Sequence, residues 1–116
     1  MDLINTYRIS VGLKALIKTN YISYKAEDHN KYMIANNVIN HDGFDARYID
    51  IKNVLRATGM GENVAFNYIS AKAVVDGWLA SPGHKANILG NFTHFGISVR
   101  PDSAGKKYYT NIFVKI

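Results

Sequence analysis

The sequence predicts an α+β fold of layered helices and strands, and three observations support that prediction. Apolar residues recur at steps of three and four through the first half of the chain, which is typical of helices that bury one face. A short alternating segment and another helix follow, and two alternating segments joined by a turn close the chain as an antiparallel hairpin. Helices and strands do not alternate regularly, so repeated βαβ units are excluded. The length of 116 residues fits one domain over 1–116.

Three helices are predicted in the first half. The first covers residues 2–10 and the second residues 23–37. The third covers 45–57 and ends where Gly59 and Gly61 break it. In the second helix, the positions that share one face are Ile22, Ala26, His29 and Met33.

The second half alternates between strand and helix signals. Residues 63–68 alternate apolar and polar side chains, which indicates a strand. Ser70 is a good N-cap for the next helix, and Pro82 suits the first position of a short helix after it. The apolar stripe of the Ser70-capped helix consists of Ala71, Val74, Val75, Trp78 and Leu79. The hairpin strands lie on either side of a turn at 101–105.

Composition excludes several classes of function. The net charge is +5, but the basic residues are scattered and the longest basic run is Lys106-Lys107, so a nucleic-acid interface is not expected. Cysteine is absent, which removes thiol catalysis and thiolate metal sites. No apolar run is long enough to span a bilayer, so membrane attachment would need a segment outside this chain.

Three residues at the ends of predicted elements are candidates for chemistry. His41 lies in the turn-rich segment 40–43, and turns often carry functional side chains. Glu62 stands at the entrance of a predicted strand. His84 falls in the first turn of the Pro82 helix, where the helix dipole disfavours protonation and favours the neutral imidazole that a metal ligand or base requires.

The other two histidines favour structural roles. His29 shares the apolar face of the second helix, which predicts a buried core histidine. His94 lies in a hairpin strand on the face opposite to that of its neighbour Phe95, which predicts a surface or rim position.

Other catalytic motifs are missing. Gly59-Met60-Gly61 precedes a strand, which is the wrong context for a phosphate loop. The sequence contains no G-x-S-x-G motif, so a nucleophile elbow is excluded.

Several segments together resemble one family. Residues 61–65 (GENVA) are similar to the GEN segment of CAP domains, and residues 78–89 (WLASPGHKANIL) closely resemble a bacterial W-x-x-S-P-G-H segment. Residues 40–44 (NHDGF) stand where bacterial members have S-H-x-G, and residues 92–113 match the closing hairpin. The chain thus resembles a bacterial member of the CAP superfamily, which includes cysteine-rich secretory proteins, antigen 5 and pathogenesis-related proteins.

The resemblance implies an α-β-α sandwich, with a small antiparallel sheet between helical layers. It also implies export, so we expect a secreted or surface-anchored protein whose precursor carries a secretion or lipoprotein signal. The family's cleft would consist of His41, Glu62, Ser81 and His84, with Ser81 in place of a second glutamate of plant members. A divalent metal such as zinc would bind through His41 and His84.

Three hypotheses for function remain open. The first is a binding module whose cleft takes a divalent metal or a small-molecule, lipid or protein ligand. The second is a metal-assisted hydrolase in which Glu62 serves as base or ligand and a bound water is the nucleophile. The third is an interaction domain whose cleft residues form a buried hydrogen-bond network. The serine at position 81 weighs against the hydrolase, which would use a second carboxylate to share acid and base roles.

Overall fold

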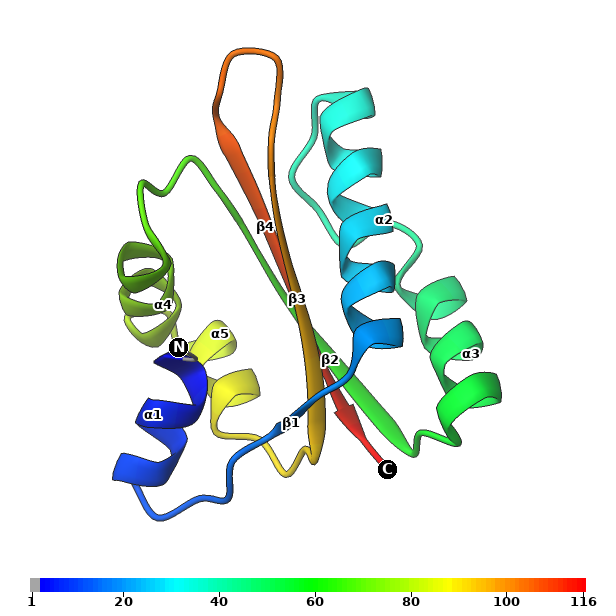
Figure 1. The fold of residues 1–116 in the computed structure, drawn as a ribbon, viewed down its shortest axis with the longest axis vertical. Helices are drawn as coiled ribbons and strands as arrows, with labels where there is room; N and C mark the ends of the chain where they lie inside the picture. The colour runs from blue at the N-terminus through cyan, green and yellow to red at the C-terminus, as the bar shows by residue number, and fades with distance from the viewer. Residues whose placement is uncertain (1–2) are drawn as a thin grey trace.

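The computed structural model describes residues 3–116, and it is a sheet with a layer of helices on each face (Figure 1). One layer holds α1 (Leu3–Ser10), α4 (Ala71–Leu79) and α5 (Pro82–Ile88). The other holds α2 (Asn20–Asn36) and α3 (Phe44–Leu55). The predicted α+β class and the α-β-α sandwich are therefore confirmed.

The sheet is mixed, with strand order β1-β3-β4-β2. The hairpin strands β3 (His94–Pro101) and β4 (Lys107–Lys115) are antiparallel, and β2 (Gly59–Phe66) pairs antiparallel with β4 on its other side. The two-residue strand β1 (Ile17–Lys18) pairs in parallel with the beginning of β3. The sequence did not predict β1, because two residues are too few to show alternation.

Some predicted boundaries were wrong. The third helix ends at Leu55, where Arg56 adopts a left-handed conformation with φ of 58°, so Gly59 and Gly61 do not break it. Both glycines instead belong to β2. At Gly61 an added Cβ would lie 2.7 Å from Oδ1 of Asn87, so glycine there allows the close approach of α5 to β2.

The sheet has an apolar core on each face. On the side of α1, α4 and α5, the buried residues include Val74, Trp78 and Phe113. On the side of α2 and α3, they include Ile22, Ile51 and Ile112. Each helical layer therefore covers one face of the sheet.

Two local features fix the helices against the sheet. Ser70 caps α4 as predicted, because its hydroxyl accepts a hydrogen bond from the amide of Ala73 at 3.1 Å. Gly96 lets α2 lie directly on β3, since an added Cβ would overlap the backbone nitrogen of Ser23.

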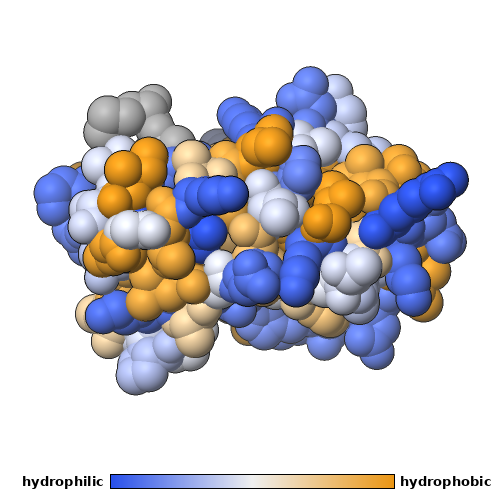
Figure 2. Space-filling view, turned by 90° about the horizontal axis from the view of Figure 1, so that it is seen from below, coloured by the Kyte–Doolittle hydropathy of each residue, from blue (hydrophilic) through white to orange (hydrophobic). Residues whose placement is uncertain are grey.

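The surface mixes apolar and hydrophilic side chains. Figure 2 views the end of the molecule that is lowest in Figure 1, and its orange apolar groups are broken up by blue hydrophilic ones. Within residues 3–116, no helix combines the length and apolarity needed to cross a membrane.

Candidate functional site

Glu62 is a charged residue in the interior of the sandwich. Its side chain is 0% exposed, because it extends from β2 into the space between the sheet and the helices α2 and α3. Arg47 of α3 binds both carboxylate oxygens, with Nε donating to Oε2 at 2.8 Å and Nη2 donating to Oε1 at 2.7 Å. This two-point pairing neutralises the carboxylate and fixes its orientation.

His41 approaches the same carboxylate from the turn before α3. Its Nδ1 lies 2.9 Å from Oε1 of Glu62, and since the carboxylate can only accept, Nδ1 is the donor. Arg47 also holds the turn, because Nη1 donates to the carbonyl of Asp42 at 2.5 Å. The His41 side chain is 50% exposed. The buried carboxylate of Glu62 therefore fixes the orientation of the imidazole through Nδ1, and Nε2 remains available to bind a ligand.

His84 lies on the α5 side of the same region. The Asn63 side chain donates to the His84 carbonyl at 3.1 Å, and Asn87 donates to the Glu62 carbonyl at 3.3 Å and to Oδ1 of Asn63 at 2.9 Å. These amide contacts tie α5 to β2 beside Glu62.

The pKa of the His84 imidazole is lowered from its ordinary value, mainly by burial and further by the nearby His41. The fold thus brings His41 into contact with Glu62, and the Asn63 and Asn87 side chains hold the backbone of α5, which carries His84, against β2. The depressed pKa agrees in direction with the sequence expectation for His84, but burial is its main cause.

His29 stands behind the site in the core. It is 2% exposed, as its place on an apolar helix face predicted. Its Nε2 donates to the carbonyl of Asn40 at 2.7 Å and lies 3.8 Å from Oε1 of Glu62, while Nδ1 has no hydrogen-bond partner within residues 3–116. Burial lowers the pKa of His29, although the Asn40 carbonyl and the charge of Glu62 act in the opposite direction.

Two further residues named in the sequence analysis make other contacts. His94 is half-buried in β3, and its Nδ1 lies 2.7 Å from the hydroxyl of Thr93, in keeping with a rim position. Ser81 is the N-cap of α5, although its side chain makes no capping hydrogen bond. Within residues 3–116, the Ser81 hydroxyl has no hydrogen bond to His41, Glu62 or His84.

Arg47 is the functional residue that the sequence analysis missed. It is 9% exposed and lies four residues before the buried Ile51, on the same face of α3. A lone arginine on an apolar helix face signals a buried ion pair, because such a charge is rarely buried without a partner. The sequence did carry this signal, but not the identity of the partner.

The side chains present allow at most a two-histidine metal site. Among the described residues, no group of three or more His, Cys, Asp or Glu side chains is arranged to hold a metal ion. Glu62 is already bound by Arg47 and His41, so it fits the role of a residue that orients a ligand. Nε2 of His41 and the imidazole of His84 are the groups that could bind a metal.

Two curated proteins are similar to this chain in sequence. The chain is 34% identical to the uncharacterised membrane protein YlbC of Bacillus subtilis over 99% of its length, and 31% identical to the uncharacterised protein YkwD of the same organism over 84%. It spans about a third of YlbC (33%) and 39% of YkwD.

Solved structures of bacterial proteins have a similar fold. An extracellular SCP-domain protein of Bacillus anthracis superposes with a TM-score of 0.85 at 29% identity, covering 98% of this chain and 38% of that one. An outer surface protein of Borrelia burgdorferi superposes with a TM-score of 0.86 at 21% identity, covering 97% of this chain and 86% of that one, which shows a shared fold. The sequence also matches the model of the CAP, or cysteine-rich secretory protein, family over residues 1–114. The chain therefore belongs to the CAP family.

Proposed function

We propose that this CAP domain acts outside the cell as a binding module, and that its cleft takes a divalent metal ion such as zinc through His41 and His84. The observation that carries the proposal is the contact of 2.9 Å between Nδ1 of His41 and the buried Glu62. Histidines that bind metal commonly donate their other ring N–H to a carboxylate, which fixes the tautomer and makes the ligand more basic.

The second imidazole supports the same proposal. A metal binds neutral imidazole, and burial lowers the pKa of His84, which favours its neutral form. With two protein ligands, water or a donor atom of a further ligand would complete the coordination shell. Such a site binds metal more weakly than a four-ligand structural site.

The same geometry gives less support to a metal-assisted hydrolase. A general base must accept a proton from water, but both oxygens of Glu62 are already bound, by Arg47 and His41. Releasing Glu62 would leave the Arg47 guanidinium without its partner in the interior.

The surroundings of His41 also favour a polar ligand over a lipid. Its neighbours in the turn are Asn40 and Asp42, and Arg47 lies beneath it. A small molecule or a protein side chain that brings a further donor to the metal fits this setting.

Calorimetric titration with zinc chloride tests the proposal, using protein purified without a histidine tag. We expect one zinc per chain. His41→Ala and His84→Ala should each weaken binding at least tenfold, about 1.4 kcal/mol, and the double variant should not bind. His94→Ala is the matched control, because it removes a histidine outside the cleft and should leave the affinity unchanged.

The double variant also tests the third hypothesis, a buried hydrogen-bond network. If it binds zinc as tightly as the parent, the proposed site is wrong. If it unfolds outright, the histidines serve the structure. A melting temperature within a few degrees of the parent, together with loss of zinc, supports the binding module.

An extracellular location is part of this proposal. The solved structures similar to this chain include an extracellular protein and an outer surface protein. Brief protease treatment of intact cells that express the natural full-length protein should remove the domain. Its recovery in the cytoplasmic fraction would contradict the proposal.

A further inference from the structure

The outer edge of β3 is covered by another strand only at its beginning. The short strand β1 pairs Ile17 with His94 and Lys18 with Phe95, whereas β3 continues to Pro101. In Figure 1, β1 crosses β3 only near its lower end. On the side away from β4, the segment 96–101 therefore forms an edge of the sheet that no other strand within residues 3–116 covers.

The register identifies which backbone groups face outward on this edge. Phe95 accepts a hydrogen bond from the amide of Thr19 at 2.9 Å, so its peptide groups point away from β4. Because successive residues alternate in direction, Ile97 and Val99 also point outward. Pro101, which has no N–H to donate, falls in the same outward set, as expected for a proline in a strand. An added strand could bond to the N–H and C=O groups of Ile97 and Val99.

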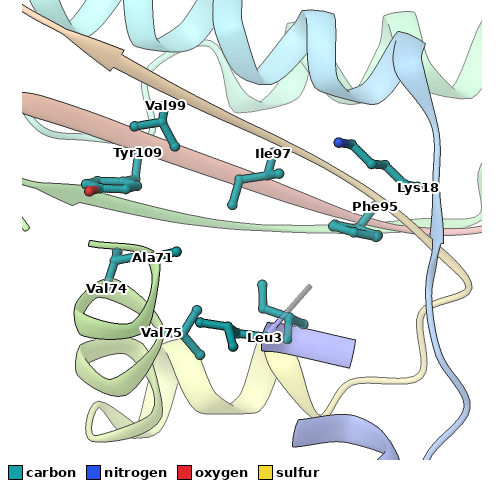
Figure 3. Close-up of a pocket in the computed structure, with 10 residues that line it drawn as sticks. Leu3, Lys18, Ala71, Val74, Val75, Phe95, Ile97, Val99 and Tyr109 are labelled. Carbon is teal, nitrogen blue, oxygen red and sulfur yellow. The ribbon is translucent and has the colours of Figure 1, made fainter. Parts of the chain in front are cut away.

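An apolar cavity of about 400 Å³ lies beside the same edge (Figure 3). It lies between the sheet, α1 and α4. The side chains that line it are Leu3, Ile4, Lys18, Ala71, Val74, Val75, Phe95, Ile97, Val99 and Tyr109. Ile97 and Val99 thus present backbone groups to the open edge and side chains to the cavity, and the Val99 residue is 48% exposed.

Lys18 gives this region its charge. Among residues 3–116 it is the one charged residue that lines the cavity, and it lies in β1, where the uncovered edge begins. Within residues 3–116, no carboxylate forms an ion pair with Lys18. Arg100, further along the edge, is paired with Glu27 at 3.2 Å. This ammonium group, which no carboxylate of residues 3–116 pairs, is complementary to a carboxylate of a partner.

We propose that the β3 edge binds an extended segment of another protein as an additional strand. The segment would bond to Ile97 and Val99 through its backbone, place an apolar side chain in the cavity, and set a carboxylate against Lys18. Main-chain pairing supplies affinity in such strand addition, and the pockets for alternate side chains supply specificity. This site is independent of the His41 and His84 cleft and of the function proposed for it.

A phage-displayed library of random decapeptides, selected on the whole domain, tests the proposal. The enriched sequences should alternate apolar and polar residues and contain an acidic residue. A synthetic peptide of that sequence should bind in the micromolar range, and Lys18→Glu should weaken it at least tenfold. Only every second amide of the bound peptide would face β3. N-methylation of that set of alternate amides should therefore abolish binding, whereas N-methylation of the other set should not.

Val99→Pro distinguishes the contribution of backbone pairing to peptide binding from that of side-chain contact. It removes one outward N–H without touching the pairing with β4, so the fold should survive while peptide affinity falls at least tenfold. Val99→Thr is the matched control, because it retains the N–H and should bind within a few-fold of the parent.

A fluorescent fatty acid is the probe for the competing occupant, a lipid chain in the cavity. Ala71→Phe should obstruct the cavity for either ligand, whereas Val99→Pro should affect the peptide alone. The proposal is overturned if no selected peptide binds more tightly than about 100 µM. It is also overturned if the peptide binds Val99→Pro as well as the parent, or if only the fatty acid binds.

Discussion

At the scale of single residues, the ion pair of Arg47 and Glu62 organises the candidate site. Arg47 uses Nε and Nη2 on the carboxylate and Nη1 on the turn that carries His41. One guanidinium group therefore sets the positions of both the acid and the histidine. The side chain of Glu62 is fully buried, so water cannot readily take the place of Arg47 as its hydrogen-bond donor.

Breaking this pair should destabilise the domain strongly. We expect Glu62→Gln or Arg47→Met to lower the free energy of unfolding by about 3–5 kcal/mol, because each leaves a buried charge without its partner. The double variant should lose less than the sum of the two. Urea unfolding measures these values. The exposed pair of Lys72 and Asp76, 2.6 Å apart, is the control, and its removal should cost less than about 0.5 kcal/mol.

His29 should make the stability of the domain depend on pH. Burial lowers its pKa in the folded state, so below its unfolded value of about 6.5 the unfolded chain binds more protons than the folded one. The contribution of His29 is complete above that pH and is lost as the pH falls. His84 acts in the same direction. Urea unfolding between pH 7.5 and pH 5 should show the loss, and His29→Gln should reduce it; an unchanged pH dependence in His29→Gln would contradict the assignment.

The sequence named His41 and Glu62, which the structure brings into contact, but it did not name Arg47, and the omission has a physical reason. His41, Glu62 and His84 were recognisable because each stands in a motif near an element boundary. Arg47 was not recognised, because its role depends on which side chain faces α3 from the sheet. That pairing joins residues 15 apart in sequence through tertiary packing and leaves no local pattern.

At the scale of elements, α4 shows how a helix is fixed by its apolar stripe. Val74, Val75 and Trp78 are buried against the sheet, whereas Ala71 lies exposed at the rim of the cavity. Trp78 also donates from Nε1 to the carbonyl of Val64 at 3.1 Å, so it satisfies a polar group on β2 that would otherwise lack a partner.

Trp78→Ala should therefore lower the free energy of unfolding by about 3–5 kcal/mol, the range for removing a buried tryptophan. Trp78→Phe should cost less, because it keeps much of the packing and loses mainly the hydrogen bond. Urea unfolding of both variants tests this. A loss below about 1 kcal/mol for the alanine variant would mean that the side chain does not form the core described here.

The longer helices and the hairpin could be predicted because periodicity over eight or more residues is a strong local signal, and the seven-residue α5 could be predicted from Pro82 at its start. β1 could not, since its two residues become a strand only when β3 lies beside them. The glycines at 59 and 61 were wrongly taken as breakers, because both belong to β2, and at Gly61 the absence of a side chain allows the close approach of α5.

At the scale of the whole molecule, the sandwich separates two surfaces of different chemistry. The cluster of His41, Arg47 and Glu62 is polar, whereas the cavity beside β3 is apolar. Their separation allows each to be altered without the other. Sequence motifs pointed to the cleft but not to the cavity, because a cavity and an open edge arise from packing between elements.

The measurement that tests the central claim most directly is a titration of the domain with zinc, followed through the side-chain ¹⁵N resonances of its four histidines. We expect Nε2 of His41 and one ring nitrogen of His84 to shift together as zinc binds, while Nδ1 of His41 keeps the proton that it donates to Glu62. His29 and His94 should not respond. Zinc-dependent shifts at His29 or His94, or none at His41 and His84, would contradict the account.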